Sequence, residues 1–352
     1  MYLKLPVVCF FPLFASLCLA QGLQGTPLSQ PTDTPPTSPT VQIASWTAPK
    51  VEHAYGLPEA KPNAKGTLAV NSAGLTFSSK SGRYTIPWAS TVALSNGSER
   101  VELWGTTGTI VRMMIPNGGG LAAAGVMHHK IYELTVEFHD TRGSYHAAVF
   151  VLPARDATQV LDSYNQAVPP IKNDPAAANL ALNLAEPATP ACSGSPDSSP
   201  SVLVAAPTWS QADVPAAYRA LVYEHVVDRL QHVEGIGRVY RAGENHSSAA
   251  CPRYTVTIAV VGFKPGSQVV RAMTGPIGFF AGTTQMVFSL KITDAAGSLN
   301  VTEQIKAAAR GESQSKNVAD GVAKKLAKYY AASVKQYAAN KPIEVAERSS
   351  SL

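Results

Sequence analysis

GTLAVNSAGLTFSSKSGRYTIPW, residues 66–88, decides the fold of the first half of the chain. Short runs rich in apolar and β-branched residues at 66–70, 74–79 and 83–88 alternate with the turn-forming stretches NSAG and SG. Runs of this length separated by such turn residues are typical of β-hairpins. The stretch therefore predicts three antiparallel strands in a meander.

Further strands are expected on the C-terminal side of the meander. They fit residues 90–94, 109–115, 131–139 and 144–152, and the last two are joined across the turn DTRG. Residues 154–166 then place their apolar side chains at helical spacing. A single amphipathic helix of this kind covers one open end of a strongly bent sheet.

The second half of the chain, residues 201–340, mixes helical and strand patterns. A helix that opens at Pro215 and a long final helix at 315–338 carry apolar residues at helical spacing. The residues between them alternate as strands do, with a hairpin turn at DAAG. One strand, 202–205, is expected ahead of the first helix, and the strands expected between the two helices are 238–241, 253–263, 285–293 and 298–310. The chain as a whole is therefore predicted to be α+β.

The first twenty residues indicate export. Lys4 precedes an apolar stretch that ends in Cys18-Leu19-Ala20, which is the pattern of a secretory signal peptide. We expect cleavage after Ala20 and a periplasmic or extracellular location, with a lipoprotein site at Cys18 as the alternative. The stretch is shorter than the ~20 residues of a spanning helix, so no transmembrane helix is expected in the mature chain.

Composition divides the rest of the chain. A Pro/Thr/Ser-rich leader at 21–49 and a Pro/Ala/Ser-rich linker at 168–200 have few large apolar residues, and both are expected to be disordered. They bound a β domain at 50–167 and an α/β domain at 201–340. A disordered tail is expected at 341–352.

Two cysteines remain once the signal peptide is removed. Cys192 lies in the predicted linker, and Cys251 lies in the second domain. An oxidising compartment favours a disulfide between them, and two unpaired thiols are the alternative.

The net charge of +5 is spread along the chain, and its densest run is near the C-terminus. Lys316, Lys324, Lys325 and Lys328 lie on the polar side of the final helix without interleaved aromatic residues. Nucleic acid is therefore not an expected partner. The run is interpreted as a solvated helix face, with an anionic-lipid contact as the alternative.

Histidines cluster around the last hairpin of the first domain, and they carry no zinc-like spacing to a cysteine or carboxylate. We expect exposed hairpin residues, and neither a metal site nor a cofactor is predicted. They are His128, His129, His139 and His146.

A second group, on the first helix of the second domain, contains Glu224, His225 and Asp228. One helical turn separates residues of this group, so it suits an exposed salt-bridged pair as well as a catalytic dyad. The exposed pair is the interpretation preferred here, and no catalytic residue is assigned.

The segment 262–284 is too long for a plain strand connection and mixes glycines with apolar residues. Exposed apolar residues in such a loop often mark an interface with a protein or a membrane. Packing of the segment back onto its own sheet is the preferred interpretation, and partial exposure as a partner or membrane contact is the alternative. The candidate contact residues are Arg271 at the base, then Met273, Ile277, Phe279 and Phe280.

The first domain resembles bacterial members of the pleckstrin-homology-like superfamily over residues 66–166. The resemblance lies in the strand order, the closing helix and the runs GTLAV, GLTF and YTIPW. It implies an antiparallel β-barrel or sandwich with a C-terminal helix. The basic phosphoinositide-binding loop of some members has no counterpart, because the first hairpin turn offers only Asn71, Ser72 and Ala73.

The second domain resembles a bacterial envelope domain family that is itself similar to the N-terminal domain of TolB and to the curli secretion component CsgG. The matching positions are Gly266, Arg271, Gly275, Gly278, Gly282 and the segment 287–297. The resemblance implies an α/β fold and an envelope location without a reaction.

Taken together, these features predict a non-enzymatic exported envelope protein that acts as a binding or assembly module. An envelope protein or a peripheral membrane contact is the expected partner. Two alternatives stay open: a small-molecule or peptidoglycan-binding module, and a hydrolase whose site residues are dispersed along the chain.

Overall fold

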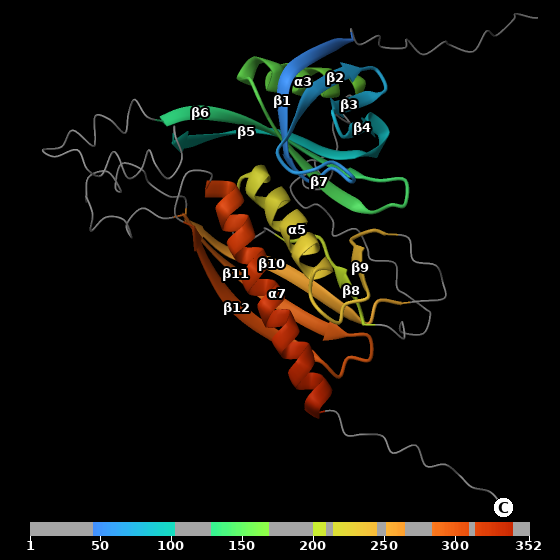
Figure 1. Cartoon of the computed structure of the whole chain (residues 1–352), viewed down its shortest axis with the longest axis vertical. Helices are drawn as coiled ribbons and strands as arrows, with labels where there is room; N and C mark the ends of the chain where they lie inside the picture. Colours follow the sequence, from blue (N-terminus) through green and yellow to red (C-terminus); the bar gives the residue numbers. More distant parts are fainter. Residues whose placement is uncertain are drawn as a thin grey trace, which may run out of the picture. The chain divides into compact units, whose positions relative to one another are not determined.

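Helices and two β-sheets make up the chain, so the predicted α+β class is confirmed (Figure 1). The computed structural model describes residues 45–102, 128–168, 200–208, 214–244, 251–264, 284–309 and 314–340. Seven strands form the first sheet, and five form the second.

The first sheet is antiparallel throughout and runs in the order β4-β3-β2-β1-β7-β6-β5. Among the described strands, β4 and β5 are its two edges and no pairing closes it into a barrel. The predicted meander is present, with Asn71 Oδ1 accepting the N–H groups of Ala73 and Gly74 in its first turn. The strands are β1 (Trp46–Tyr55), β2 (Ala64–Asn71), β3 (Gly74–Ser79), β4 (Gly82–Pro87), β5 (Thr91–Glu102), β6 (His128–His139) and β7 (Tyr145–Leu152).

Strand β1 was not predicted, and it begins inside the range assigned to the leader. Pro49 lies in the middle of the strand, where proline normally argues against sheet structure. The chain accommodates it with a bulge, because the register shifts between Pro49 and Val51 and Lys50 has a φ of 63°. The predicted strand at 109–115 lies outside the described residues, so β1 supplies the seventh strand.

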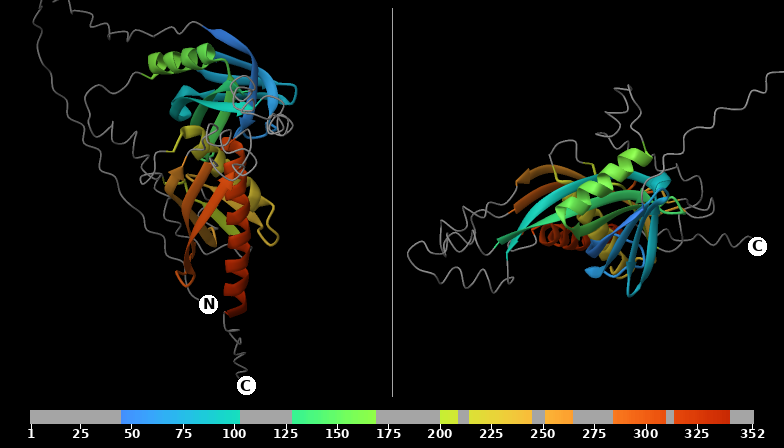
Figure 2. Two further views of the ribbon diagram at one scale, coloured as in Figure 1. Left: turned by 90° about the vertical axis from the view of Figure 1, so that its left-hand side faces the viewer. Right: turned by 90° about the horizontal axis from the view of Figure 1, so that it is seen from above.

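Helix α3 (Ala154–Ala167) follows the first sheet as predicted. It packs over β2, β5 and β6 (Figure 2). Ala157 and Val160 enter the core of the sheet, which contains Leu68, Phe77 and Phe150. The predicted apolar face of the helix is therefore the face that packs.

The second sheet has the order β12-β11-β10-β8-β9. Strands β10, β11 and β12 are antiparallel to one another, and β8 is parallel to both of its neighbours. Each strand matches a predicted one to within a few residues. They are β8 (Ser201–Val204), β9 (Arg238–Arg241), β10 (Tyr254–Lys264), β11 (Thr284–Asp294) and β12 (Asn300–Ala309).

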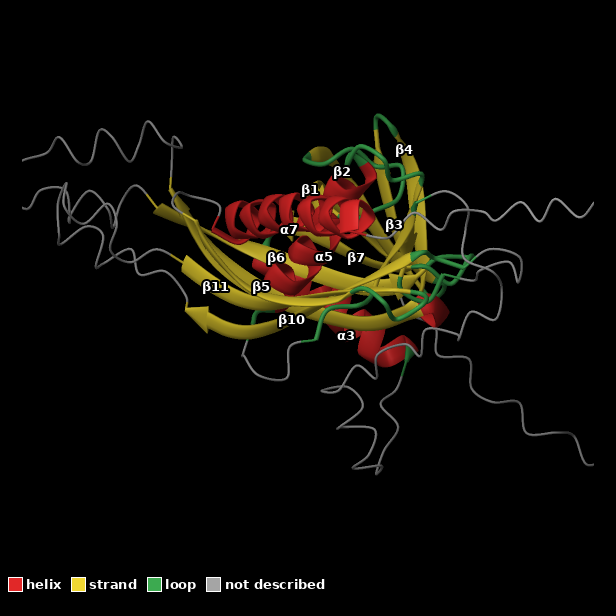
Figure 3. Cartoon of the chain, turned by 90° about the horizontal axis from the view of Figure 1, so that it is seen from below, coloured by secondary structure: helices red, strands yellow, loops and turns green. Residues whose placement is uncertain are grey.

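Helices α5 (Ala216–Gln231) and α7 (Gln314–Asn340) lie beside each other against this sheet (Figures 1 and 3). Val318, Val322 and Leu326 of α7 are fully buried, as the predicted helical register requires. They share one core with side chains from β10 and β11.

Helix α5 is buried on both of its sides. Tyr218 packs against Phe263 of the second sheet, with ring centroids 5.1 Å apart. Tyr223 packs against Tyr145 of the first sheet, with ring centroids 5.0 Å apart. A helix with apolar residues on nearly every side is expected to be buried on every side, as α5 is. One core therefore extends from β7 through α5 to the second sheet, and the described residues from β1 to α7 belong to one compact unit.

The first prediction concerns this shared core. A specific protease site inserted in the segment 168–200 should allow a cut that leaves the two fragments associated at neutral pH. Separation would expose the side of α5 that covers β7, at a cost of about 25 cal/mol per Å² of apolar surface. Size-exclusion chromatography after cleavage measures this. Elution of two folded, separate monomers would contradict the shared core.

Candidate functional site

A buried ion pair joins α5 to both sheets. Arg241, at the end of β9, donates from Nη1 and Nη2 to the two carboxylate oxygens of Glu224, at 2.9 and 2.7 Å. Glu224 Oε1 also accepts the N–H of Ala147 in β7 at 2.9 Å, and Arg241 Nη1 donates to the carbonyl of Tyr145 at 3.1 Å. The pair is therefore bonded to the backbone of the first sheet as well as to itself.

Burial alone would lower the pKa of Arg241, but the charge and hydrogen bonds of Glu224 outweigh it and raise that pKa. Arg241 therefore stays charged. A bidentate arginine–carboxylate pair is also among the strongest hydrogen-bonded pairs in proteins, because it fixes geometry as well as charge.

Two further hydrogen bonds lie beside the ion pair. The N–H of Tyr145 donates to the carbonyl of Ala242 at 2.8 Å, and the N–H of Ala242 donates to the hydroxyl of Tyr223 at 3.0 Å. Gly243 follows with a φ of 72°, and a Cβ there would lie 2.8 Å from the carbonyl oxygen of Gly143. We call this contact of α5 and residues 241–243 with β6, β7 and their turn the junction.

Glu137 of β6 is a further buried carboxylate at the junction. It accepts the hydroxyl of Tyr145 at 2.7 Å and lies 3.8 Å from Arg219 of α5. Burial raises the pKa of Glu137, while Tyr145 and Arg219 oppose the shift.

The expectation that Glu224 and His225 lie on an exposed helix face is wrong. Their side chains are 2% and 6% exposed, respectively, because the face opposite the second sheet is covered by the first. Sequence offered one signal: Ala217, Ala220 and Val227 make the supposedly polar side of α5 apolar as well.

The expectation of exposed hairpin histidines is wrong for His146, which is 3% exposed. Its ring stacks on Phe138 with centroids 5.3 Å apart, and its Nε2 lies 3.4 Å from Asp140 Oδ2. His139 pairs with Tyr145 in the strand register, so it is not opposite His146. Residues of the described ranges form no group of three potential ligands that could hold a metal ion.

Burial lowers the pKa of His146 to about 4, and the neighbouring Arg241 adds to the shift. Glu224 and Asp140 oppose it. Asp140 is the only carboxylate in contact with the ring among the described residues, and its attraction does not offset the burial, so the neutral ring is favoured.

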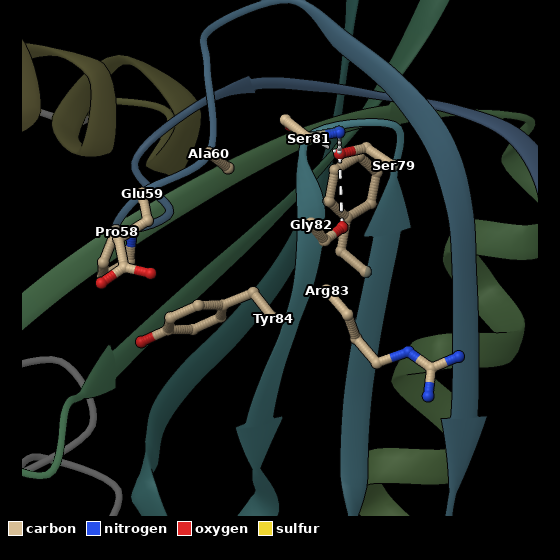
Figure 4. A pocket seen from close by; sticks show the side chains of 9 residues that line it. Pro58, Glu59, Ala60, Ser79, Ser81, Gly82, Arg83 and Tyr84 are labelled. Atoms are coloured by element: carbon tan, nitrogen blue, oxygen red, sulfur yellow. Dashed lines mark hydrogen bonds between the residues drawn. The ribbon is translucent and has the colours of Figure 1, made fainter.

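A small hollow lies between the β1–β2 loop and the β3–β4 turn (Figure 4). It has a volume of about 50 Å³, whereas one water molecule needs ~10–15 Å³ of such space. Arg83 and Tyr84 point to opposite sides of their strand, and Arg83 Nε donates to Ser78 Oγ. The hollow has room for a few water molecules. It is lined by Pro58, Glu59, Ala60, Phe77, Ser79, Ser81, Gly82, Arg83 and Tyr84.

The candidate contact residues of the segment 262–284 lie outside the described residues, so their role stays a prediction. They are Arg271, Met273, Ile277, Phe279 and Phe280. Cys251 is buried. The other cysteines lie outside the described ranges, and pairing with Cys192 therefore stays a prediction as well.

The lysine run of the final helix is on α7. Lys324, Lys325 and Lys328 are exposed, and Lys316 Nζ donates to Asn63 Oδ1 in the β1–β2 loop at 2.6 Å. None of the helices described here is long and apolar enough to cross a membrane.

Comparisons with known proteins identify no family for this chain. No family model and no curated protein matches the sequence. Among solved structures, the PelC dodecamer from Paraburkholderia phytofirmans aligns with 39% of this chain and 89% of its own, at 13% identity and a TM-score of 0.25. A PelC variant from the same organism aligns with 38% and 90%, at 17% identity and a TM-score of 0.26. These scores are too low to support an argument about fold or function.

The second prediction tests the ion pair. Arg241→Met should lower the free energy of unfolding by about 3–5 kcal/mol, because it leaves the Glu224 carboxylate buried without its partner. Urea unfolding measures the change. Arg229→Met is the matched control, since it breaks the 2.7 Å pair with Asp320 whose side chains are 44% and 43% exposed, and pairs of that kind contribute about 0–1 kcal/mol. Equal effects of the two substitutions would contradict the cost of leaving the Glu224 carboxylate buried without its partner.

The third prediction concerns His146. Its pKa is lower in the folded chain than the ordinary 6.5, so between about pH 6.5 and 4 only the unfolded chain binds the proton. The free energy of unfolding should therefore fall as the pH drops through this window, by on the order of 3 kcal/mol. Glu137 acts in the opposite direction because its pKa is raised.

The comparison that isolates His146 is wild type against His146→Gln at each pH. The variant should not show this decrease in the free energy of unfolding at acid pH. His232→Gln, which changes an exposed histidine of the same chain, should still show it. Parallel pH profiles for wild type and His146→Gln would show that the ring does not titrate as expected.

Proposed function

We propose that the chain is an exported, non-enzymatic binding or assembly module of the bacterial envelope. The N-terminal signal-peptide pattern supports export to the periplasm or beyond. Residues from both halves of the chain would form the body that holds a partner there.

The element order supports the family assignments that we propose for the two parts. Seven antiparallel strands followed by α3 fit a pleckstrin-homology-like domain, in which β1 pairs with both β2 and β7. Helix α5, the strands β9 to β12 and helix α7 fit the envelope domain similar to the TolB N-terminal domain and CsgG.

The observation that carries the proposal is the sharing of α5 by both sheets. Three hydrogen bonds fix the two parts to each other: Ala147 N–H to Glu224, Arg241 to the carbonyl of Tyr145, and Tyr145 N–H to the carbonyl of Ala242. A binding site that is built on rigid elements keeps its geometry better than one on mobile connections. A body of this kind suits a protein that holds other molecules in place.

The fourth prediction tests the contact segment. The double change Phe279→Ser and Phe280→Ser should release the protein from the envelope fraction without lowering its melting temperature, because we place both rings at a partner surface. Fractionation of tagged full-length protein, together with its thermal unfolding, measures this. Val92→Ser is the control, since Val92 is an exposed apolar residue of the first sheet at 38% exposure.

Each other outcome contradicts a part of the proposal. A large loss of stability would show that the two rings belong to the core, and no change in either property would show that the segment is a tolerated insertion. The mature chain in the same fraction should begin at Gln21, so N-terminal sequencing that finds the leader retained would contradict cleavage after Ala20.

A further inference from the structure

His225 of α5 contacts the first sheet through a buried, titratable ring. The ring stacks on Tyr55, at the end of β1, with centroids 4.2 Å apart and an interplanar angle of 26°. The side chain is 6% exposed, and its Nε2 is buried without a hydrogen-bond partner. A titratable group is therefore part of the packing between the first sheet and α5.

Charged groups from two elements act on the ring: Asp228 and Arg229 of α5, and Asp320 and Lys316 of α7. The neutral ring of Tyr55 in β1 stacks on it. Both carboxylates already have partners. Asp320 accepts from Arg229 at 2.7 Å, and Asp228 interacts with the hydroxyl of Tyr55. Lys316 and Arg229 repel a protonated ring, Arg229 while it is paired with Asp320, and the two aspartates attract one more strongly.

Burial lowers the pKa of His225, Lys316 and Arg229 add to the shift, and the two aspartates oppose it. Tyr55 would also attract an imidazolium ring through its π face, by about 0.5–2 kcal/mol. Desolvation is the largest of these effects, so the packed state favours the neutral ring. Separation of Tyr55 from α5 would let water reach Nε2 and remove this penalty.

We propose that His225 is an acid-sensitive switch that releases the first sheet from α5 when it becomes protonated. In the open state the hydrated ring would take up a proton near its ordinary pKa of about 6.5. The equilibrium constant for opening would then rise by up to about tenfold for each pH unit below 6.5. Opening uncovers the side of α5 that carries Tyr223 and Glu224, which becomes a new surface at low pH.

His146 is a second buried histidine near the contact. Its ring stacks on Phe138 within the first sheet, and the charges of Arg241 and Glu224 act on its pKa. His225 is the histidine that stacks on a residue of the opposite part, so the test compares variants of His225.

Two backbone amides report on the junction directly in the full chain. Ala147 N–H donates to Glu224, and Tyr145 N–H donates to the carbonyl of Ala242. Hydrogen exchange of both amides, corrected for the intrinsic effect of pH, should accelerate by up to about tenfold per pH unit between pH 6.5 and 5. Amides of β11, which is paired on both sides, should keep their protection over the same range.

His225→Gln should abolish this acid-induced exchange, because glutamine does not titrate. His225→Phe is a second variant that keeps the stacking on Tyr55, and it serves if the glutamine variant does not fold. His232→Gln is the matched control, since His232 is exposed just beyond the same helix, and this variant should behave as wild type.

Three results would overturn the switch. The first is unchanged protection of Ala147 and Tyr145 in the wild type at pH 5. The second is the same acid-induced exchange in a folded His225 variant. The third is simultaneous loss of protection at the junction and in β11, since this would mean global unfolding.

Discussion

Helix α5 has sheet on two sides, and most of the architecture depends on this constraint. Its side chains from Ala217 to Val227 are almost all buried, so neither sheet alone removes the helix from water. The apolar residues on the different sides of α5 are buried only when both sheets cover the helix. The fold therefore has β7 and β10 on opposite sides of α5. The two parts are therefore linked by packing as well as by sequence.

The ion pair of Glu224 and Arg241 has a different consequence from the apolar core. Burying two charges costs several kcal/mol for each ion, and their attraction repays this only when the geometry is good and the remaining hydrogen bonds are made. Ala147 and Tyr145 supply those bonds from the first sheet. The pair is thus satisfied only when the first sheet has the right position, so it selects one arrangement of the parts rather than adding much net stability.

Sequence predicted individual elements well and their association poorly. The meander, α3, α5, α7 and the strands of the second sheet follow from local periodicity and turn residues. Strand β1 did not, because Pro49 argues against a strand unless a bulge at Lys50 accommodates it. The burial of Glu224, His225 and His146 was also missed. These side chains are polar, and for Glu224 and His225 it is the packing of the first sheet on α5 that removes them from water.

A polar junction differs from an apolar one in how it can be controlled. Apolar burial between α5 and β7 responds little to a single proton, whereas a buried ring or carboxylate responds by a factor of up to ten for each unit of pH. The junction holds such groups in opposing senses, because burial favours the neutral forms of both His225 and Glu137. Acid therefore penalises the packed histidine while it relieves the packed carboxylate. The pH at which the first sheet separates from α5 then depends on the opposing pKa shifts of these two groups. Because the ring of His225 stacks directly on Tyr55, its protonation acts on the contact between α5 and the first sheet.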